Sequence, residues 1–386
     1  MICVCTHRCV SPYPLTLTAA PPQPRSLEGD GPDPQRPVPS IPTLPPHLRV
    51  VRGEAALALP IARRLVSQAN PDIDDAARRL VASAPAHNIS LANTFATVDN
   101  DGPPASGQST AAGSLRVRQT CLAVLGAGRT AMMFISEPLR TGDWGGSELA
   151  FAERVHVVNA CCDMLAREHA HDVALAQALP DPDERYATRV FDAAGFRSVG
   201  TLKYMRRLPK PHDKKLSLGP DLSLCDKFPQ GVHVQSLSQL PPELRDEHCV
   251  RAMDASYEST LDCPELCGLR ETRDILASHK STGQHDPNLW WIIYYNNQPL
   301  GCAFFSPCAE QRTCELVYLG LGPPLRGKGL ARMLLGHGIA ETNRINSVWS
   351  MSCAVDERNA PALKLYESMH FRAFARRRAL VRRLHP

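Results

Sequence analysis

The sequence has no apolar run close to the roughly 20 residues that a helix needs to cross a bilayer. Its N-terminal stretch MICVCTHRCVSPYPLTLTAA is mixed in character and lacks the charged-then-apolar order of a signal peptide. The formal net charge is only +4 over 386 residues, too small an excess to favour nucleic acid as a partner. We therefore expect a protein that acts on neither a membrane nor a nucleic acid.

The 14 cysteines lack the paired spacing of a zinc site. Cys3, Cys5 and Cys9 form a short cluster, and Cys263 is followed by Cys267, but no C-x-x-C pair with histidine partners occurs. Scattered cysteines in a chain of this length fit a reducing compartment, where most thiols act as small core residues. The sequence thus predicts a cytoplasmic protein without a metal cofactor.

The composition along the chain divides it into four parts. Residues 1–47 form a Pro-rich leader, with 12 of the 34 prolines and almost no apolar periodicity, which predicts disorder. Residues 210–230 are polar, contain Pro and Gly, and are expected to be a linker between domains at 48–209 and 231–386. In the first domain, periodicity predicts helices over 54–68, 147–172 and 183–196, and strands within 115–136, 173–179 and 201–208.

The second domain repeats the order of elements of the first. Strands are expected at 231–237, 289–307 (a hairpin), 313–321, 348–355 and 374–384, with helices up to about 280, at 329–346 and at 359–371. The segments DERYATRVFDAAGF and DERNAPALKLYESMHF match best when Phe196 is aligned with Phe371, 175 residues further on. A shared order and a local match indicate a duplicated domain.

The stretch GPPLRGKGLARML, residues 322–334, has the composition of a phosphate-binding loop. Gly322 to Lys328 match the first seven positions of a P-loop, but Gly329 replaces the Ser or Thr that holds magnesium. The tandem proline after Gly322 removes two amide donors, which also argues against a nucleotide hydrolase. The alternative is the pattern R-x-x-G-x-A, from Arg326 to Ala331, between a strand and a helix. There, glycines and a helix N-terminus would bind a pyrophosphate.

Two further features complete a resemblance. Asn359 opens a predicted helix, Tyr366 follows seven residues later, and the preceding strand ends at Leu321. With these motifs, residues 232–386 resemble the GNAT N-acetyltransferase superfamily, which implies an α/β fold of two tandem domains, each a mixed, mostly antiparallel sheet flanked by helices. The resemblance also implies acetyl-CoA as co-substrate and a primary amine as acceptor. The CoA-binding residues that it implies are Leu319, Gly320 and Leu321 for the pantetheine arm, Arg326, Gly327, Lys328, Gly329, Leu330 and Ala331 for the pyrophosphate, and Asn359.

The resemblance also suggests catalytic residues. Tyr366 corresponds to the tyrosine that often protonates the CoA thiolate, and a phenol with a pKa of about 10 is protonated at neutral pH. The oxyanion would be met by a strand N–H, that of Leu321. Ala354 stands where some GNAT families have a glutamate base, whereas Glu315 resembles the glutamate that another group uses. Strand alternation would place Glu315 on the face of Leu321, where apolar surroundings would raise its pKa.

The acceptor would enter beside ESTLDCPELCGLRETRD, where Tyr257, Asp262 and Glu265 are candidates to hold a cationic amine. The first domain has Phe191 in place of the tyrosine and Glu184 in place of the asparagine, and no R-x-x-G-x-A loop. It therefore resembles a degenerate GNAT domain, in a layout similar to that of mycothiol synthases. Two functions remain open: an acyl-CoA-dependent N-acyltransferase that works from the second domain, and a non-catalytic acyl-CoA-binding or scaffold protein.

Overall fold

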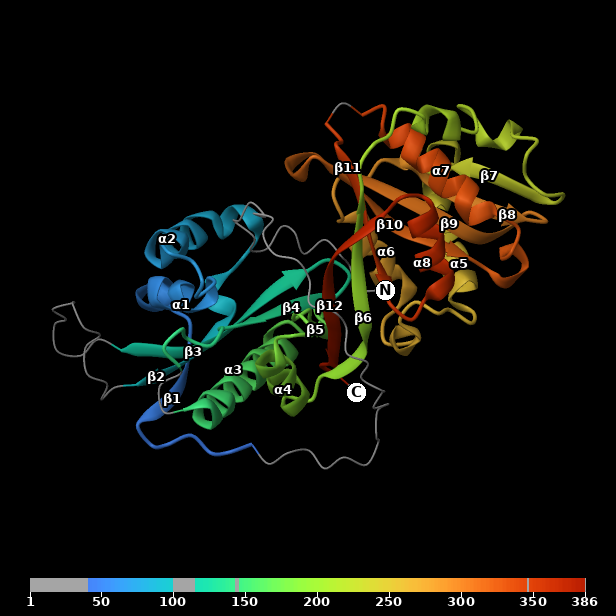
Figure 1. Ribbon diagram of the computed structural model, residues 1–386. Helices are drawn as coiled ribbons and strands as arrows, with labels where there is room; N and C mark the ends of the chain where they lie inside the picture. Colours follow the sequence, from blue (N-terminus) through green and yellow to red (C-terminus); the bar gives the residue numbers. More distant parts are fainter. Residues whose placement is uncertain (1–40, 100–114, 143–145, 346, 386) are drawn as a thin grey trace.

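A computed structural model describes residues 41–99, 115–142, 146–345 and 347–385. Most of the leader expected at 1–47 lies outside the described residues. One mixed, mostly antiparallel sheet runs through both halves of the chain, in the strand order β1-β2-β3-β4-β5-β12-β6-β11-β10-β9-β8-β7. Figure 1 shows helices packed on each half of this sheet. In the part of the chain that the structure describes, no helix has the length and apolar character of a membrane span.

The first half alternates helices and strands and ends on a long strand. Its long central helix, α3, buries one side against the sheet, as the apolar positions of its sequence predict. The elements are β1 (Leu48–Arg52), α1 (Ala58–Leu65), α2 (Ile73–Ser83), β2 (Thr94–Asp99), β3 (Arg116–Gly126), β4 (Thr130–Ile135), α3 (Ser147–Glu168), β5 (Leu175–Ala178), α4 (Arg185–Ala193) and β6 (Arg197–Arg207).

The second half has the same order of elements from its hairpin onward. The segment expected to be a linker is ordered and packs on α7, where the Leu218 N–H donates to His337 Nδ1 at 3.2 Å. The elements are β7 (Val232–Ser236), α5 (Pro242–Tyr257), α6 (Thr272–Lys280), β8 (Trp290–Tyr295), β9 (Gln298–Cys308), β10 (Thr313–Leu321), α7 (Leu330–Thr342), β11 (Ser350–Asp356), α8 (Ala360–Ser368) and β12 (Arg372–Arg383).

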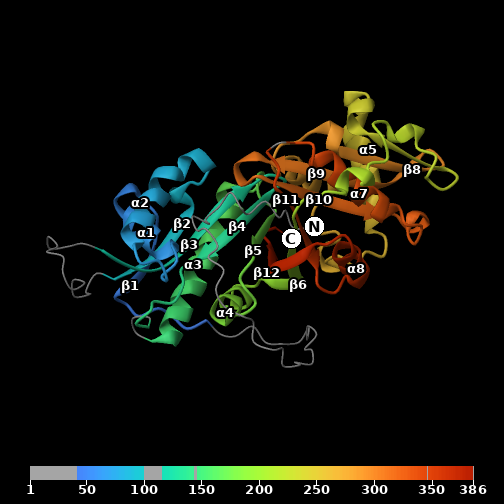
Figure 2. The same ribbon diagram turned by 45° about the horizontal axis from the view of Figure 1, so that its top comes forward.

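The two halves exchange their last strands. β6, from the first half, pairs antiparallel with β11 of the second half, from Met351 to Asp356. β12, the last strand of the second half, lies between β5 and β6 and pairs with both. Figure 2 shows β12 and β6 side by side at the junction. The apolar cores follow this exchange: Leu380 of β12 belongs to the core of the first half, and Met205 of β6 to that of the second.

The offset of 175 residues predicted from the sequence recurs in the structure. α4 and α8 begin at Arg185 and Ala360, and β6 and β12 begin at Arg197 and Arg372. The residues before the two helices have nearly the same backbone angles, φ −77° and ψ 68° in the first half and φ −81° and ψ 72° in the second. The two helices therefore follow their strands in the same way, as expected for duplicated units.

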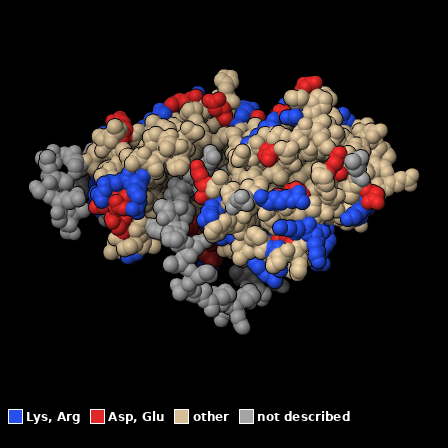
Figure 3. Space-filling model, turned by 90° about the horizontal axis from the view of Figure 1, so that it is seen from above, with Lys and Arg blue, Asp and Glu red and all other residues tan. Residues whose placement is uncertain are grey.

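Charged residues are distributed over the surface. In Figure 3, acidic and basic side chains are interspersed over the face seen from above, with uncharged surface between them. Arg-rich β12 contributes exposed guanidinium groups, and several of them are paired: Arg376 with Glu357, and Arg377 with Asp181. The basic C-terminal strand is thus a half-exposed strand of the sheet with its own acidic partners.

Candidate active site

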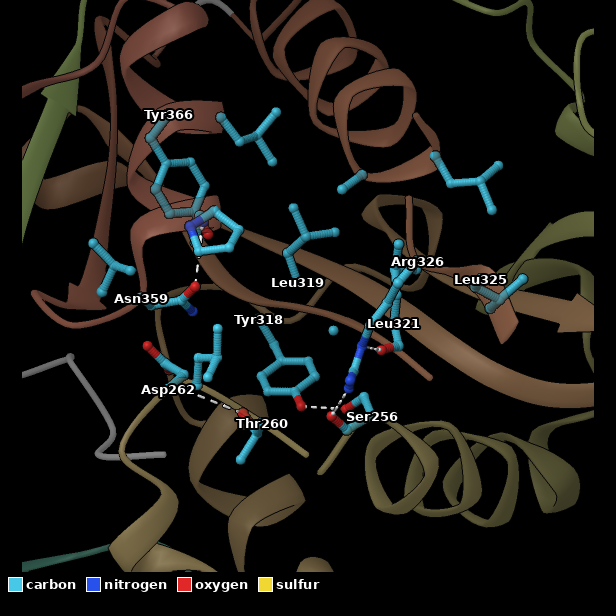
Figure 4. A pocket seen from close by; sticks show the side chains of 18 of the residues that line it. Ser256, Thr260, Asp262, Tyr318, Leu319, Leu321, Leu325, Arg326, Asn359 and Tyr366 are labelled. Carbon is cyan, nitrogen blue, oxygen red and sulfur yellow. Dashed lines mark hydrogen bonds between the residues drawn. The ribbon is translucent and has the colours of Figure 1, made fainter. Parts of the chain in front are cut away.

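A cavity of about 570 Å³ opens in the second half, between the ends of β10 and β11. The glycine-rich loop, the N-terminal turns of α7 and α8, and residues 259–262 between α5 and α6 complete its walls. Figure 4 shows Tyr366 and Asp262 at one end of the cavity, Arg326 and Leu321 at the other, and Leu319 between them. The cavity is thus elongated along the edge of β10.

β10 and β11 separate along this cavity, as the resemblance implied. Their parallel pairing joins Thr313–Glu315 to Ser350–Ser352 and ends there, whereas β10 stays paired with β9 to its end. The Gly322 N–H donates to a carbonyl of β9 at 2.7 Å. Because successive residues of a paired strand direct their backbone groups to opposite sides, those of Leu319 and Leu321 face the cavity.

Two glycines open the loop that precedes α7. Gly327 and Gly329 have φ angles of 72° and 76°, and no atom beyond their chain neighbours lies within 4 Å of the position of an added Cβ. Gly329 is the N-cap of α7, whose first N–H groups have no partner within the helix. Within this described loop, the N–H groups from Gly327 to Ala331 donate to no backbone carbonyl. The loop is therefore an open set of amide donors suited to an anion.

The two cations of the loop have other contacts than those expected. The Arg326 guanidinium donates to the Leu321 carbonyl at 2.8 Å and to carbonyls at the end of α5. The Lys328 ammonium lies 5.0 Å from the centre of the Tyr295 ring, and Lys328 does not line the cavity. Arg326 lines the cavity and Lys328 does not, so the expected contact of both side chains with a pyrophosphate stays a prediction. Arg326 fixes the loop against β10 and α5.

Asn359 and Tyr366 both lie on α8 and line the cavity. Asn359 caps the helix, because its Oδ1 accepts a hydrogen bond from the Ala362 N–H at 3.2 Å. Tyr366 is 7% exposed, and burial, with the nearby Cys353 and Asp262, raises the pKa of Tyr366 well above its ordinary value. The phenol therefore keeps its proton at neutral pH and can donate it into the cavity.

Residues 253–371 match the family model of the acetyltransferase (GNAT) family. This part of the chain belongs to the GNAT superfamily. Across 89% of this chain and 98% of its own, a GCN5-related N-acetyltransferase from Sphaerobacter thermophilus superposes with a TM-score of 0.53 at 16% identity, which shows the shared fold. A tandem GNAT protein from the clavulanic acid biosynthesis pathway gives 0.45 at 14% identity, over 88% and 99% of the two chains. No curated protein sequence matches this chain.

Glu315, the candidate base, lies outside the cavity wall. It is buried, and burial raises the pKa of Glu315 to about 7, but it does not line the cavity. A bulge in the pairing with β9, between Leu316 and Tyr318, interrupts the alternation that was expected to place Glu315 on the face of Leu321. Contact between Glu315 and an acceptor would therefore have to pass through water.

The three predicted acceptor residues have different surroundings. Asp262 lines the cavity. Glu265 instead forms a bidentate ion pair with Arg358, at 2.6 and 2.8 Å, and this hydrogen bonding lowers the pKa of Glu265. Tyr257 is absent from the cavity wall and packs edge-on against Tyr318, with ring centres 6.3 Å apart. The expectation that all three residues face the acceptor is thus corrected to Asp262 alone.

Arg358 was not predicted from the sequence, although it organises this side of the cavity. It pairs with Asp356 at 2.6 Å as well as with Glu265, and it donates to the Val199 carbonyl of β6 at 2.9 Å. Burial would raise the pKa of Asp356, but hydrogen bonds from Arg358 and Cys263 outweigh it and keep that pKa below its ordinary value. A charged pair after a strand resembles many surface pairs, so no local pattern predicts this network.

The first half has different side chains in the region that corresponds to the cavity. The Arg154 side chain of α3 donates to the Ser136 carbonyl, just beyond β4, at 2.9 Å. Phe191 takes the place of Tyr366 on the equivalent helix and is fully buried. Residues 143–145, part of the segment predicted to lack a CoA loop, lie outside the described residues.

Among the residues that the structure describes, no group of His, Cys, Asp and Glu is placed to hold a metal ion.

Proposed function

We propose that the second half transfers an acetyl group from acetyl-CoA to a primary amine by direct attack. One observation carries this proposal: a single cavity joins an open set of amide donors to a buried proton donor along the free edge of a strand. Membership of the GNAT superfamily supports acyl-CoA as the donor. A non-catalytic acyl-CoA-binding protein would need the amide donors but not the buried phenol.

The residues present fit CoA. The amides from Gly327 to Ala331 would hold the pyrophosphate, since their glycines leave room for its oxygens. The backbone groups of Leu319 and the Leu321 N–H would bond the amides of the pantetheine arm, as a further strand would, because the Leu321 carbonyl already accepts from Arg326. The Asn359 side chain lies beside this path, on the cavity wall.

This orientation places the thioester at the Tyr366 end of the cavity. Arg326 fixes Leu321 beside the glycine loop, so Leu321 lies at the pyrophosphate end and is poorly placed to meet the oxyanion. The bulge between Leu316 and Tyr318 lies further along β10, and Val317 within it lines the cavity. We assign the oxyanion donor to an N–H of this bulge, in place of that of Leu321.

Tyr366 would then protonate the departing sulfur. In the tetrahedral intermediate, either the amine or the sulfur can leave, and a proton on the sulfur favours its departure as a thiol. A positioned acid of this kind contributes about 10²–10⁴-fold in rate. The position tolerates phenylalanine in this fold, because Phe191 and Phe196 form the same ring pair as Tyr366 and Phe371, with centres 5.0 and 5.7 Å apart. Tyr366→Phe should therefore test the hydroxyl without disturbing the fold.

The experiment measures CoA release from acetyl-CoA with a panel of primary amines, together with acetyl-CoA affinity by calorimetry. We expect turnover with at least one amine, a loss of about 10²–10⁴-fold in kcat for Tyr366→Phe, and an unchanged Kd for acetyl-CoA. Tyr186→Phe removes a tyrosine hydroxyl from α4 of the first half and serves as the matched control. Acetyl-CoA binding without turnover of any amine would instead favour the non-catalytic protein.

A further inference from the structure

The Tyr366 end of the cavity carries one carboxylate. Among the described residues that line the cavity, Asp262 is the only acidic one. The lining cations, Arg326 and Arg332, lie at or near the glycine loop, and Arg332 donates to the Ser368 hydroxyl at 2.6 Å. Negative charge is thus confined to the end where the acceptor must meet the thioester.

Asp262 is held firmly but is not neutralised. Its Oδ1 accepts a hydrogen bond from the Asp356 N–H at 2.9 Å, and the nearby Asn359 side chain lowers the pKa of the same carboxyl. The next residue, Cys263, donates its N–H to the Asp356 carboxylate at 3.0 Å. In the described part of the chain, no Lys or Arg forms an ion pair with Asp262, so its described partners are hydrogen-bond donors.

We propose that Asp262 binds the acceptor as a primary ammonium group and takes the proton that frees its lone pair. This inference rests on the proposed acetyl transfer. It specifies which residue binds the acceptor and that the acceptor arrives as a cation. Removing a carboxylate partly from water without a Lys or Arg partner raises the free energy of the folded protein. An ammonium group from the ligand would lower it again. Leu261, which also lines the cavity, is 53% exposed and offers an apolar contact to the carbon chain of the amine.

The proton and electron balance closes with these two side chains. One N–H bond of the ammonium breaks as Asp262 takes the proton, and the freed lone pair forms the N–C bond to the thioester carbon. When the C–S bond breaks, sulfur takes a proton from Tyr366. The new amide nitrogen sheds a second proton, which restores Tyr366, and Asp262 returns its proton to water.

The surroundings of Asp262 raise its pKa and so make it a stronger base than an exposed aspartate. Burial raises the pKa of Asp262, the Asp356 carboxylate on β11 adds to this, and the hydrogen bonds from Asp356 and Asn359 oppose it. The other titratable groups that interact with Asp262 are the neutral forms of Cys263 beside it, Cys353 on β11, Tyr318 on β10 and Tyr366 on α8.

Arg358 is the positioning residue for this carboxylate. It binds both Asp356, which holds Asp262, and Glu265, which lies in the same loop. Its third partner, the Val199 carbonyl, belongs to the strand contributed by the first half. The first half thus takes part in placing the acceptor loop.

The test compares Asp262→Asn with the whole wild-type chain and with Glu258→Gln, an exposed carboxylate near the start of the same loop, as the matched control. Asparagine keeps an oxygen for the Asp356 N–H but cannot take the proton. We expect Asp262→Asn to lower kcat/KM for the amine by about 10²–10⁴-fold and to lose the acidic limb of the pH profile, with Kd for acetyl-CoA within about twofold of wild type. Glu258→Gln should match the wild type in all three measurements.

Two outcomes overturn the inference while leaving acetyl transfer intact. One is unchanged kcat/KM and an unchanged acidic limb in Asp262→Asn, and the other is loss of that limb in Glu315→Gln instead. If Asp262→Asn no longer binds acetyl-CoA, Asp262→Glu is measured in its place. We expect this variant to have a reduced kcat and to keep the acidic limb of the pH profile. An unchanged kcat would contradict the inference. Absence of turnover in the wild type would refute the proposed function itself.

Discussion

Glu315 makes the stability of this protein depend on pH in a way that a single substitution can remove. Burial raises its pKa from the ordinary value of 4.5 to about 7. Below pH 4.5 the carboxyl is protonated in both the folded and the unfolded chain. Between pH 4.5 and 7 the unfolded chain releases the proton and the folded chain keeps it, so the unfolded state is increasingly favoured. Above pH 7 the loss is complete and stays constant.

The size of the effect follows from the shift. About 2.5 pKa units at 1.36 kcal/mol per unit correspond to about 3 kcal/mol of stability lost between pH 4.5 and 7. That is a large part of the roughly 5–15 kcal/mol that keeps a typical domain folded. Glu315→Gln has no charge to release, so its stability relative to wild type should rise by about this amount as the pH is raised across this interval.

The assay is urea unfolding of the wild type and of Glu315→Gln at pH 4.5 and pH 8, in the same salt. Glu310→Gln, an exposed glutamate in the turn before β10, serves as the control and should follow the wild type at both pH values. A free-energy difference between wild type and Glu315→Gln that is the same at both pH values would refute the reasoning, because Glu315 would then ionise as easily when folded as when unfolded.

Three further substitutions or deletions test other parts of the structure. Gly329→Asp should raise Kd for acetyl-CoA at least tenfold, whereas Gly219→Asp, at an equally open glycine with positive φ outside the cavity, should not; equal effects in calorimetry would argue against the anion loop. Gly200→Ala would bring a Cβ within 2.8 Å of the Asp356 carboxylate; it should cost roughly 1–3 kcal/mol in urea unfolding and raise KM for the amine, and wild-type behaviour would contradict the close packing. A chain shortened to residues 231–386 lacks β6 and should unfold without a cooperative transition; a sharp transition would contradict the strand exchange.

The elements proposed to bind CoA were largely predictable, because their signals are local. Glycines before an amphipathic helix, an asparagine at a helix start and a tyrosine two turns later form a pattern that needs no knowledge of distant contacts. For the same reason, the offset between Phe196 and Phe371 gave the matching starts of α4 and α8. The short strands β1 and β2 and the helix α2 were not predicted, although α2 is amphipathic.

The rest of the site depends on contacts between segments far apart in the chain. Nothing near Arg326 indicates that its guanidinium would bond carbonyls of α5, 70 residues away, for the spacing fits a phosphate ligand equally well. The bulge in β10 that separates Glu315 from the cavity face arises from pairing with β9, which a period-two pattern does not encode. Likewise, Glu265 and Asp262 have partners at the end of β11, about 90 residues away. Only the folded chain shows that Glu265 is paired with an arginine and that Asp262 faces the cavity.

The exchange of β6 and β12 has a consequence for how the chain is made. During synthesis the first half leaves the ribosome without the strand that completes its sheet, since β12 is translated only after the other elements of the second half. Its apolar core lacks Leu380 until then, and β5 has an open edge that a neighbouring chain could pair with. The sheets of the two halves are thus completed together, because each half depends on a strand from the other.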